Sequence, residues 1–304
     1  MSTRILLTGS NGLLGQKIVN LLAERSHVDL LALGKDINRH PLRIGYEYRS
    51  VDLTDHEAVA AIFADFQPTS VIHAAAMTQV DTCETEKELC DAVNVHATAY
   101  LAKLCKEYGS HMVHISTDFI FDGENGPYKE SDPVGPVNYY GKSKLKAEQE
   151  IQVIGGSYSI LRTILLYGIT PGMSRSNIVL WVRSSLADGK QINVVNDQFR
   201  CPTLAEDLAT ASVTAAMKRA KGIYHISGPD MMCIVEIARE VADFFGLDKS
   251  MIGETDSASL GQKAKRPPKT GFILLKAQTA LDYKPHTFRQ GLAVLQRQMQ
   301  QIGA

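Results

Sequence analysis

The octapeptide TGSNGLLG, residues 8–15, restricts the fold of this chain more than any other stretch of its sequence. It places three glycines at intervals of three, directly after an apolar strand-like run and at the start of a helical one. Glycines at this spacing allow a tight turn, let the backbone approach a pyrophosphate and let the helix pack on its strand. The stretch therefore predicts a dinucleotide site, and the alternative is an ordinary glycine-rich turn of an α/β protein. The residues expected to contact the dinucleotide are Gly9, Ser10, Asn11, Gly12, Leu13 and Gly15.

Short β-rich runs alternate with longer helical patterns along the first half of the chain. The first helical run places Leu14, Ile18, Leu21 and Leu22 on one face. Strand, helix and strand in succession produce right-handed crossovers. We therefore expect an α/β fold with a Rossmann-like, doubly wound and mostly parallel sheet. The expected strands are residues 5–7, 30–33, 46–51, 71–75, 112–116 and 158–165.

Two further helices of this half are predicted from the residues at their ends. Thr54 and Glu57 have capping-box spacing at the start of one helix. The other is a long amphipathic helix over residues 84–108 that ends at Gly109, where a left-handed residue is easily accommodated. Both helices follow predicted strands, as the alternating pattern requires.

The pattern becomes less regular after Gly168, where the sequence ITPGMSRSN predicts a loop. Later runs again predict helices and strands, and the polar stretch 257–270 predicts a surface loop near the substrate. We expect a dinucleotide-binding domain over residues 1–168, to which residues 192–228 contribute. The remaining residues, 169–191 and 229–304, are expected to form a smaller C-terminal substrate domain.

Composition and charge exclude several classes of partner. The 304 residues include 32 Lys and Arg and 33 Asp and Glu, so no net field attracts nucleic acid or an anionic membrane. The N-terminus lacks the order of a signal peptide, and no apolar run approaches the length of a membrane span. Five widely spaced cysteines favour a reducing compartment. We therefore expect a cytoplasmic protein with a small-molecule ligand.

Two runs in the middle of the chain carry the candidate chemistry. STDFIFDG, residues 116–123, follows a predicted strand, at the edge where open α/β sheets bind ligands. YYGKSK, residues 139–144, puts Tyr140 and Lys144 on one helix face. We expect the ammonium of Lys144 to lower the pKa of the Tyr140 phenol, which protonates a carbonyl that Thr117 holds. The alternative for an isolated pair is an exposed aromatic residue beside a solvated lysine.

The choice between nicotinamide cofactors depends on the tip of the second predicted strand. Residues 33–39 read LGKDINR, so Lys35 and Arg39 flank Asp36. Basic side chains here accommodate a 2′-phosphate, whereas an acid accepts hydrogen bonds from the ribose 2′-hydroxyl. Asp29 precedes the apolar core of the strand and so lies at its wrong end. We therefore expect NADPH. NADH is the alternative, in which case Lys35 and Arg39 are solvated loop charges.

Other groups of reactive side chains favour packing over chemistry. His111 and His114 are three apart on a predicted strand, so we expect them on opposite faces, where they cannot share a metal. Cys83 and Cys90 are seven apart, a spacing at which two residues can share a helix face, and packing is expected to account for both. No metal site is predicted.

Taken in order, TGSNGLLG, HAAAMTQVD, STDFIFDG, YYGKSK, VNDQFRCPT and the Arg-Pro of the tail resemble the extended short-chain dehydrogenase/reductase superfamily. Within it they are most similar to the dTDP-4-dehydrorhamnose reductase family. The resemblance implies reduction by NADPH of the 4-keto group of a nucleotide-linked 6-deoxysugar, as in dTDP-rhamnose biosynthesis. It makes Thr117, Tyr140 and Lys144 the catalytic residues. It places Asp52, Leu53, Ala74, Ala75 and Ala76, with Tyr140 and Lys144, at the cofactor. It places Thr78, Asp81, Asp118, Phe119, Asn177, Arg200 and Arg266 at the substrate.

Three departures from the family's motifs concern ligands. Leu165, in TILLYG, stands where the family has an aromatic residue that contacts substrate. Arg200, in DQFRCPT, replaces a glycine, and its fork suits a diphosphate or, equally, a carboxylate of the chain itself. Lys17 stands where some members carry a glutamate implicated in a magnesium site between subunits, so no metal is expected. The number of subunits stays open, with a homodimer among the arrangements considered.

Two other functions are compatible with these motifs. A nucleotide-sugar epimerase or dehydratase of the same superfamily would retain a tightly bound NAD. The non-catalytic regulatory subunit of methionine adenosyltransferase has a similar fold, and its RIPILYG resembles RTILLYG of this chain more closely than the reductases' TSWVYG does. The presence of Thr117, Tyr140 and Lys144 favours catalysis.

Overall fold

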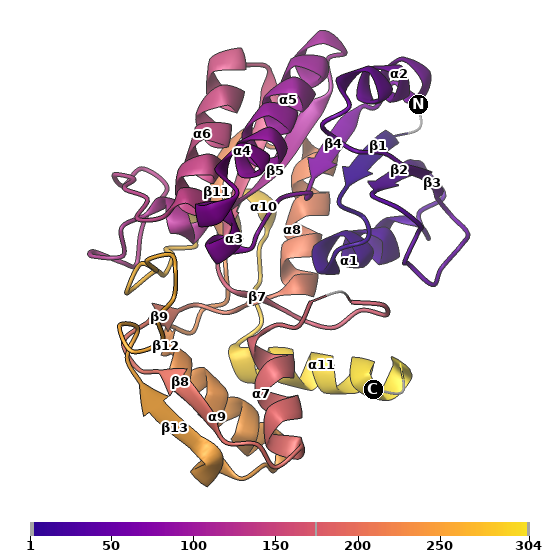
Figure 1. The fold of residues 1–304 in the computed structure, drawn as a ribbon. Coiled ribbons are helices and arrows are strands. Elements are labelled where there is room, and N and C mark those ends of the chain that lie inside the picture. The colour runs from indigo at the N-terminus through magenta and orange to yellow at the C-terminus, as the bar shows by residue number, and fades with distance from the viewer. Residues whose placement is uncertain (1–2, 174, 303–304) are drawn as a thin grey trace.

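A parallel sheet forms the centre of the larger lobe in the computed structural model, which describes residues 3–173 and 175–302 (Figure 1). Within those residues its seven strands run in the order β11, β6, β5, β4, β1, β2, β3. They are β1 (Thr3–Thr8), β2 (Val28–Gly34), β3 (Glu47–Ser50), β4 (Ser70–His73), β5 (His111–Thr117), β6 (Ser157–Thr163) and β11 (Gly222–Ile226). The chain builds outward from β1 in both directions, which confirms the expected Rossmann-like, doubly wound sheet.

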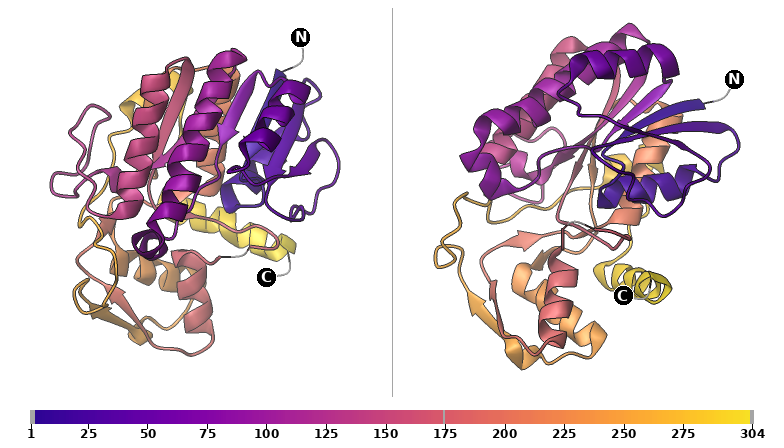
Figure 2. Two further views of the ribbon diagram at one scale, coloured as in Figure 1. Left: turned by 45° about the horizontal axis from the view of Figure 1, so that its top comes forward. Right: turned by 45° about the vertical axis from the view of Figure 1, so that its right-hand side comes forward.

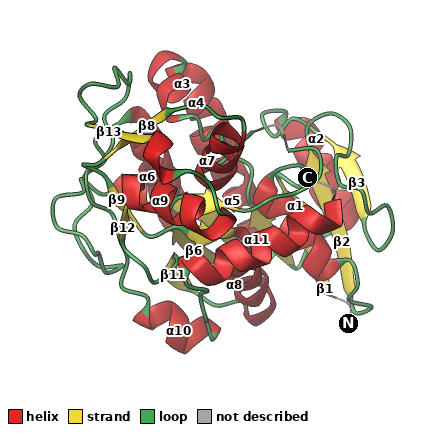
Figure 3. Cartoon of the chain, turned by 90° about the horizontal axis from the view of Figure 1, so that it is seen from below, coloured by secondary structure: helices red, strands yellow, loops and turns green. Residues whose placement is uncertain are grey.

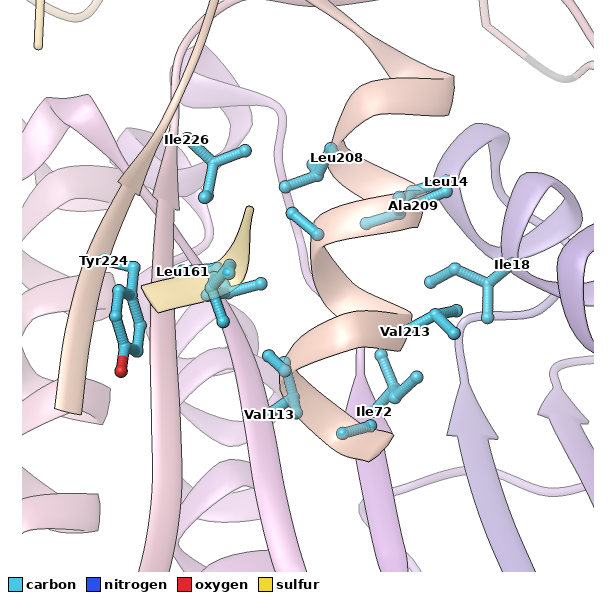
Figure 4. Close-up of a cluster of buried hydrophobic side chains, with 14 of the residues drawn as sticks. Leu14, Ile18, Ile72, Val113, Leu161, Leu208, Ala209, Val213, Tyr224 and Ile226 are labelled. Carbon is cyan, nitrogen blue, oxygen red and sulfur yellow. The ribbon is translucent and has the colours of Figure 1, made fainter. Parts of the chain in front are cut away.

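Helices cover both faces of this sheet. On one face α8 (Ala205–Lys218) packs across β4, β5 and β6, with α1 (Leu13–Leu22) beside it. Val213 of α8, Ile18 of α1 and Ile72 of β4 lie in one buried cluster (Figure 4). On the other face, α5 (Ala97–Glu107) and α6 (Tyr139–Ile154) lie side by side in front of the strands (Figure 2), and α2 (His56–Phe66) packs on α5. The helix α10 (Leu275–Leu281) packs on β11 and α8.

A smaller lobe lies below the carboxyl ends of the strands (Figure 1). It has its own apolar core, formed by α7 (Ile178–Ala187), α9 (Ile234–Phe245) and α11 (Phe288–Ile302) with short strands. Those strands are β7 (Leu166–Tyr167), β8 (Ile192–Val195), β9 (Phe199–Arg200), β10 (Thr203–Leu204), β12 (Met232–Cys233) and β13 (Ile252–Thr255). Seen from below, α11 crosses beneath α1 and α8 (Figure 3). There Gln298 bonds Lys17 and Glu206.

One segment divides between the two lobes. Residues 192–228 were expected to contribute to the larger domain, and α8 and β11 do lie on its sheet. The strand β8, however, pairs with β13 of the smaller lobe, because its apolar face packs on α9. Assignment of the domains by residue number stays a prediction.

Two predicted helices differ in detail. The helix α2 is capped by Asp55, whose side chain accepts from the Ala58 N–H, because the Thr54 hydroxyl donates to Asp52 instead. The long helix predicted over 84–108 is divided into α3 (Val80–Thr85), α4 (Lys87–Asp91), a π-helical turn η1 (Ala92–His96) and α5. Glu86 leaves helical geometry between the first two. Gly109 has the expected left-handed backbone, with a φ of 65°.

The structure also shows the state of the cysteines and the lengths of the helices. All five cysteines are buried free thiols. Among the described residues the longest helix, α6, has 16 residues. Within the described ranges, no helix combines the length and apolar character that crossing a membrane requires.

Candidate active site

A cavity of about 660 Å³ opens between the two lobes, at the carboxyl ends of the central strands. The glycine loop, the ends of β4 and β5 and the start of α6 line it from the larger lobe, and the loop before α7 lines it from the smaller one. The predicted site residues on its wall are Gly9, Asn11, Gly12, Leu13, Gly15, Ala74, Ala76, Thr78, Thr117, Asp118, Phe119, Tyr140, Lys144, Asn177, Arg200 and Arg266. The predicted residues Ser10, Lys35, Arg39, Asp52, Leu53, Ala75 and Asp81 lie outside this lining.

The backbone of the glycine loop requires glycine at two positions and leaves N–H groups free at the start of α1. Gly9 has a φ of 71°, and a Cβ there would lie 2.7 Å from the Ala75 nitrogen. A Cβ at Gly15 would collide with the Gly9 carbonyl oxygen. Gly12 is the N-cap of α1 and supplies no capping side chain, so the N–H groups of the first turn are available to an anion.

An ion pair lies beyond the glycine loop. The Lys35 ammonium is 2.7 Å from the Asp52 carboxylate, and both side chains are largely exposed. The hydrogen bond from Lys35 lowers the pKa of Asp52 to about 2. Asn11 positions this region, because its amide donates to the Lys35 carbonyl and its oxygen accepts from the Arg39 N–H. The cation predicted to contact a 2′-phosphate is thus paired with an acid of the chain itself.

Tyr140 lies at the start of α6, against the end of β5. Asn138 caps the helix by accepting from the Gly141 N–H at 2.8 Å, and a Cβ on Gly141 would collide with the Phe119 carbonyl. This close approach brings the phenol of Tyr140 to the hydroxyl of Thr117, with which it forms a hydrogen bond. The Thr117 hydroxyl lies 3.1 Å from Asp118 Oδ1 and also accepts from the Phe119 N–H.

The pKa of the Tyr140 phenol differs from the prediction. Burial raises the pKa of its phenol well above the ordinary value, and the hydrogen bond with Thr117 opposes this only in part. The sequence predicted a lowered pKa through Lys144. That prediction fails in this structure because the effect of burial on the Tyr140 phenol is the largest, while the Lys144 ammonium is bound to His114.

Lys144 is held by a residue that we assigned to packing. Its side chain is 2% exposed, and its Nζ lies 3.0 Å from Nε2 of His114 on β5. Burial lowers the pKa of Lys144 to about 8, and the charge of Glu148 opposes that effect. His111, on the same strand, instead bonds Ser157 and Ser159 of β6. The two histidines thus have separate partners, and no sequence motif marked His114.

A buried ion pair lies one helical turn beyond Lys144 on α6. Glu148, one helical turn further along α6, is completely buried and lies 2.7 Å from the Arg162 guanidinium. Ser116 at the end of β5 donates to the same carboxylate. Because both charges are paired with each other, they add little net charge to the wall of the cavity.

On the substrate side, Arg200 is bonded within the protein. Its guanidinium donates to the carbonyls of Phe199 and Pro267 and lies 3.8 Å from the buried Asp118 carboxylate. The sequence suggested that Arg200 binds either a diphosphate or a carboxylate of the chain itself. In the structure it is paired with the carboxylate of Asp118. Asp118 also accepts from Thr270, so Arg200 and Asp118 together tie the tail loop to the end of β5.

Two arginines lie at the mouth of the cavity. Arg266 forms an ion pair of 2.6 Å with Asp81. Arg175 donates to Thr78 at 2.9 Å, and the sequence analysis missed it because it lies in a loop without a motif. Asn177 caps α7 by accepting from Leu180 and donates to the Gly168 carbonyl. Leu165 lines the cavity with a left-handed backbone, its φ being 40°.

This chain is similar over nearly its whole length to three known proteins. Methionine adenosyltransferase 2 subunit beta of Mus musculus is 32% identical over 302 residues, which cover 96% of this chain and 86% of that protein. A probable low-salt glycan biosynthesis reductase of Haloferax volcanii is 30% identical over 95% of this chain and 96% of its own length. The solved structure of a dTDP-4-dehydrorhamnose reductase from Clostridium acetobutylicum superposes with a TM-score of 0.84 at 26% identity. That superposition covers 98% of this chain and all of the other.

The family assignment rests on a match along nearly the whole chain. The sequence model described as RmlD substrate binding domain matches residues 3–301. The superposition on the reductase from Clostridium acetobutylicum, with its TM-score of 0.84, shows that the overall fold is shared. The chain therefore belongs to the RmlD substrate binding domain family, that of the dTDP-4-dehydrorhamnose reductases within the extended short-chain dehydrogenase/reductase superfamily.

Proposed function

We propose that this protein uses NADPH to reduce the 4-keto group of a nucleotide-linked 6-deoxysugar, as in dTDP-rhamnose biosynthesis. One observation carries the proposal: the glycine loop and the trio Thr117, Tyr140 and Lys144 line the same cavity. A dinucleotide held by the loop therefore extends toward these three side chains. The similarity to reductases from Haloferax volcanii and Clostridium acetobutylicum supports the same chemistry.

In this proposal the chain contributes binding and proton transfer. NADPH, when bound, supplies a hydride to the carbonyl carbon. Gly9 and Gly12 bind its pyrophosphate at the start of α1, and Lys144 binds the nicotinamide ribose. Tyr140 retains its proton at neutral pH, since burial raises its pKa, and donates it to the carbonyl oxygen as that oxygen gains charge. The hydroxyl of Thr117 holds the same oxygen in a site screened from water.

Other predicted residues bind either the 2′-phosphate of the cofactor or the substrate. Lys35 and Arg39 favour NADPH over NADH, although the pairing of Lys35 with Asp52 reduces its charge toward a 2′-phosphate. We propose that the sugar lies against Asp118 and Phe119, and that its diphosphate lies near Arg266 at the mouth. Thr78, Asn177 and Arg200 complete this wall.

Replacing Tyr140 by phenylalanine tests the proposal. A panel of 4-keto nucleotide sugars is offered with NADPH and with NADH, and oxidation of the cofactor is followed by its absorbance. Loss of a general acid lowers turnover by roughly 10²- to 10⁴-fold. Tyr139→Phe is the matched control, because Tyr139 precedes it on the same helix and does not line the cavity. Turnover by Tyr140→Phe at the rate of the control would overturn the proposal.

A second candidate function comes from the 32% identity to methionine adenosyltransferase 2 subunit beta. Under this alternative the chain binds a partner enzyme and turns over none of the keto sugars. Co-purification from source cells distinguishes the two, because a stoichiometric complex together with no cofactor oxidation by the wild type favours the subunit role. Measurable turnover that depends on Tyr140 favours the reductase.

A further inference from the structure

We infer that His114 is a positioning residue for Lys144: its imidazole accepts one ammonium proton at Nε2 and leaves the other two directed toward the cavity. The contact between Lys144 Nζ and His114 Nε2 is 3.0 Å. The inference rests on the proposed function, in which Lys144 acts at the cofactor. It adds to that function a residue that neither the motifs nor the family resemblance assigned.

Burial makes this contact necessary. Lys144 is 2% exposed and His114 is fully buried, so water does not replace a lost partner on that side. An ammonium has three protons to donate and cannot accept a hydrogen bond. A buried charge without hydrogen bonds is strongly unfavourable. Since Lys144 also lines the cavity, one proton directed at β5 orients the remaining two toward the ligand.

The charged groups around Lys144 do not offer an equal acceptor. Glu148, on the same helix, is occupied by Arg162 and Ser116. Cys90 of α4 faces Lys144 as well, and its thiol bonds Ser143. His73 of β4 lies beside His114, with ring centroids 5.3 Å apart, and its two nitrogens bond Thr8 and Thr98. Within the part of the chain that the structure describes, His114 is therefore the acceptor within hydrogen-bond distance of the Lys144 ammonium.

Because the His114 imidazole is neutral, it also affects the pKa of the Lys144 ammonium. Burial and the nearby Lys144 charge lower the pKa of His114 well below its ordinary value, so it stays neutral while Lys144 is charged. A carboxylate in the same place would raise the pKa of Lys144, whereas the imidazole leaves it at about 8. The pair thus keeps an ammonium that can still lose its proton near neutral pH.

A second observation indicates that His114 is more than a packing residue. When Nε2 accepts from Lys144, the imidazole proton lies on Nδ1. This atom is buried and has no hydrogen-bond partner among the described residues. A leucine of similar size would fill the space without burying an unpaired polar group. The histidine therefore carries an unfavourable group on one side while it binds Lys144 on the other.

Titration of Lys144 tests the inference without relying on turnover. In protein labelled with ¹³C at the lysine ε-carbon, the Lys144 resonance is assigned by its loss in Lys144→Arg. Above its pKa the neutral amine accepts from Nε2–H, but a bond to the charged form is about twice as strong. His114→Leu therefore lowers the pKa of Lys144 by about 1. His114→Gln restores most of it, because the Gln amide reaches the position of Nε2.

Two further variants control for the loss of a buried histidine and for a failure of His114→Leu to fold. His111→Leu removes an equally buried imidazole from the same strand without touching Lys144, so it should leave the lysine titration in place. If His114→Leu does not fold, His114→Asn takes its place, since its shorter amide does not reach Nε2. The pH profile of kcat/KM should move with the Lys144 pKa in each variant.

The outcomes separate this inference from the proposed function. An unchanged Lys144 pKa in His114→Leu, or in His114→Asn if that variant is used, overturns the positioning role whatever the enzyme's activity. A lowered pKa restored by His114→Gln supports it, even if Tyr140→Phe shows that the assumed reaction is wrong.

Discussion

Asp81 and Arg266, 185 residues apart in the chain, join α3 to the tail loop at the mouth of the cavity. Two hydrogen bonds of 2.8 and 2.6 Å connect the guanidinium to the carboxylate. The same carboxylate accepts from the Ala264 N–H at 3.0 Å. These contacts hold the pKa of Asp81 down at about 2, with the Arg266 hydrogen bond as the largest cause. Asp81 therefore anchors the loop that closes one side of the site.

Replacing Asp81 by asparagine should loosen the tail loop. The amide cannot form the charged two-bond contact, so backbone N–H groups of residues 257–270 should exchange with deuterium faster. The free energy of unfolding should fall by no more than about 1 kcal/mol, because Asp81 is partly exposed and solvent screens the pair. Asp52→Asn removes a different exposed ion pair and is the control. Equal exchange in both variants would contradict an anchoring role.

Replacing Gly15 by alanine should lower the free energy of unfolding more than replacing Gly12 by alanine. In Gly15→Ala the new Cβ collides with backbone atoms of Gly9 and Ser10, which cannot move away as a flexible side chain can. We expect a loss of about 1–3 kcal/mol in the free energy of unfolding, together with loss of NADPH binding. In Gly12→Ala the nearest atom lies 3.3 Å away, so stability should stay within about 1 kcal/mol of wild type.

Urea unfolding and a direct NADPH titration measure the two effects separately. If Gly12→Ala loses binding while its stability is retained, Gly12 approaches the cofactor, as its place on the cavity wall suggests. Equal losses of stability in the two variants would show that the packing of α1 on the loop does not distinguish them.

Breaking the buried pair of Glu148 and Arg162 should cost far more than breaking an exposed one. Glu148→Gln leaves the Arg162 charge buried without a compensating carboxylate. We expect a loss of about 3–5 kcal/mol, measured by urea unfolding. Replacing both residues by leucine should recover most of the loss, because no buried charge is then left unpaired. A double variant as unstable as the single one would point to packing rather than charge.

The parts of the site that lie on one local element were predictable from the sequence. The glycine loop and the spacing of Tyr140 and Lys144 are set by a turn and by helical periodicity, so their place on the cavity wall follows from the pattern. The strand alternation likewise predicted the sheet, since each strand and its crossover are adjacent in the chain. Prediction succeeded where the relevant neighbours are close in sequence.

Partners from distant elements were not predictable. His114 contacts Lys144 across 30 residues, and nothing in its local pattern distinguishes it from His111. The helix over 84–108 was interrupted at Glu86 and by the π-helical turn in which Asn94 bonds the Met77 backbone. The pKa of Tyr140 depends on how completely the fold excludes water, which a spacing of four residues does not specify. Tertiary packing decides each of these.

Lys144 should make the protein less stable at neutral pH than a variant without it. Its pKa is about 8 when folded against an ordinary 10.5, so the unfolded chain binds a proton more readily between these values. The charge therefore costs about 3 kcal/mol below pH 8, and wild type regains this as the pH rises from 8 to 10.5. Lys144→Met has no buried charge and so does not lose this free energy. Its advantage in free energy of unfolding over wild type should therefore shrink by about 3 kcal/mol between pH 8 and 10.5.

Denaturant unfolding of wild type and Lys144→Met at pH 7, 9 and 10.5 measures this difference. Lys142→Met, which removes an exposed lysine from the same helix, is the control for any general effect of the substitution. Lys144→Met should also lose the ability to reduce the keto sugar. This is expected if Lys144 lowers the stability of the fold but is needed for the reaction. A stability difference that stays constant from pH 7 to 10.5 would mean that Lys144 keeps its ordinary pKa of 10.5 in the folded protein and is charged there as it is in the unfolded chain. In that case burial does not lower the pKa of Lys144, and the residue binds the cofactor as a fully charged ammonium.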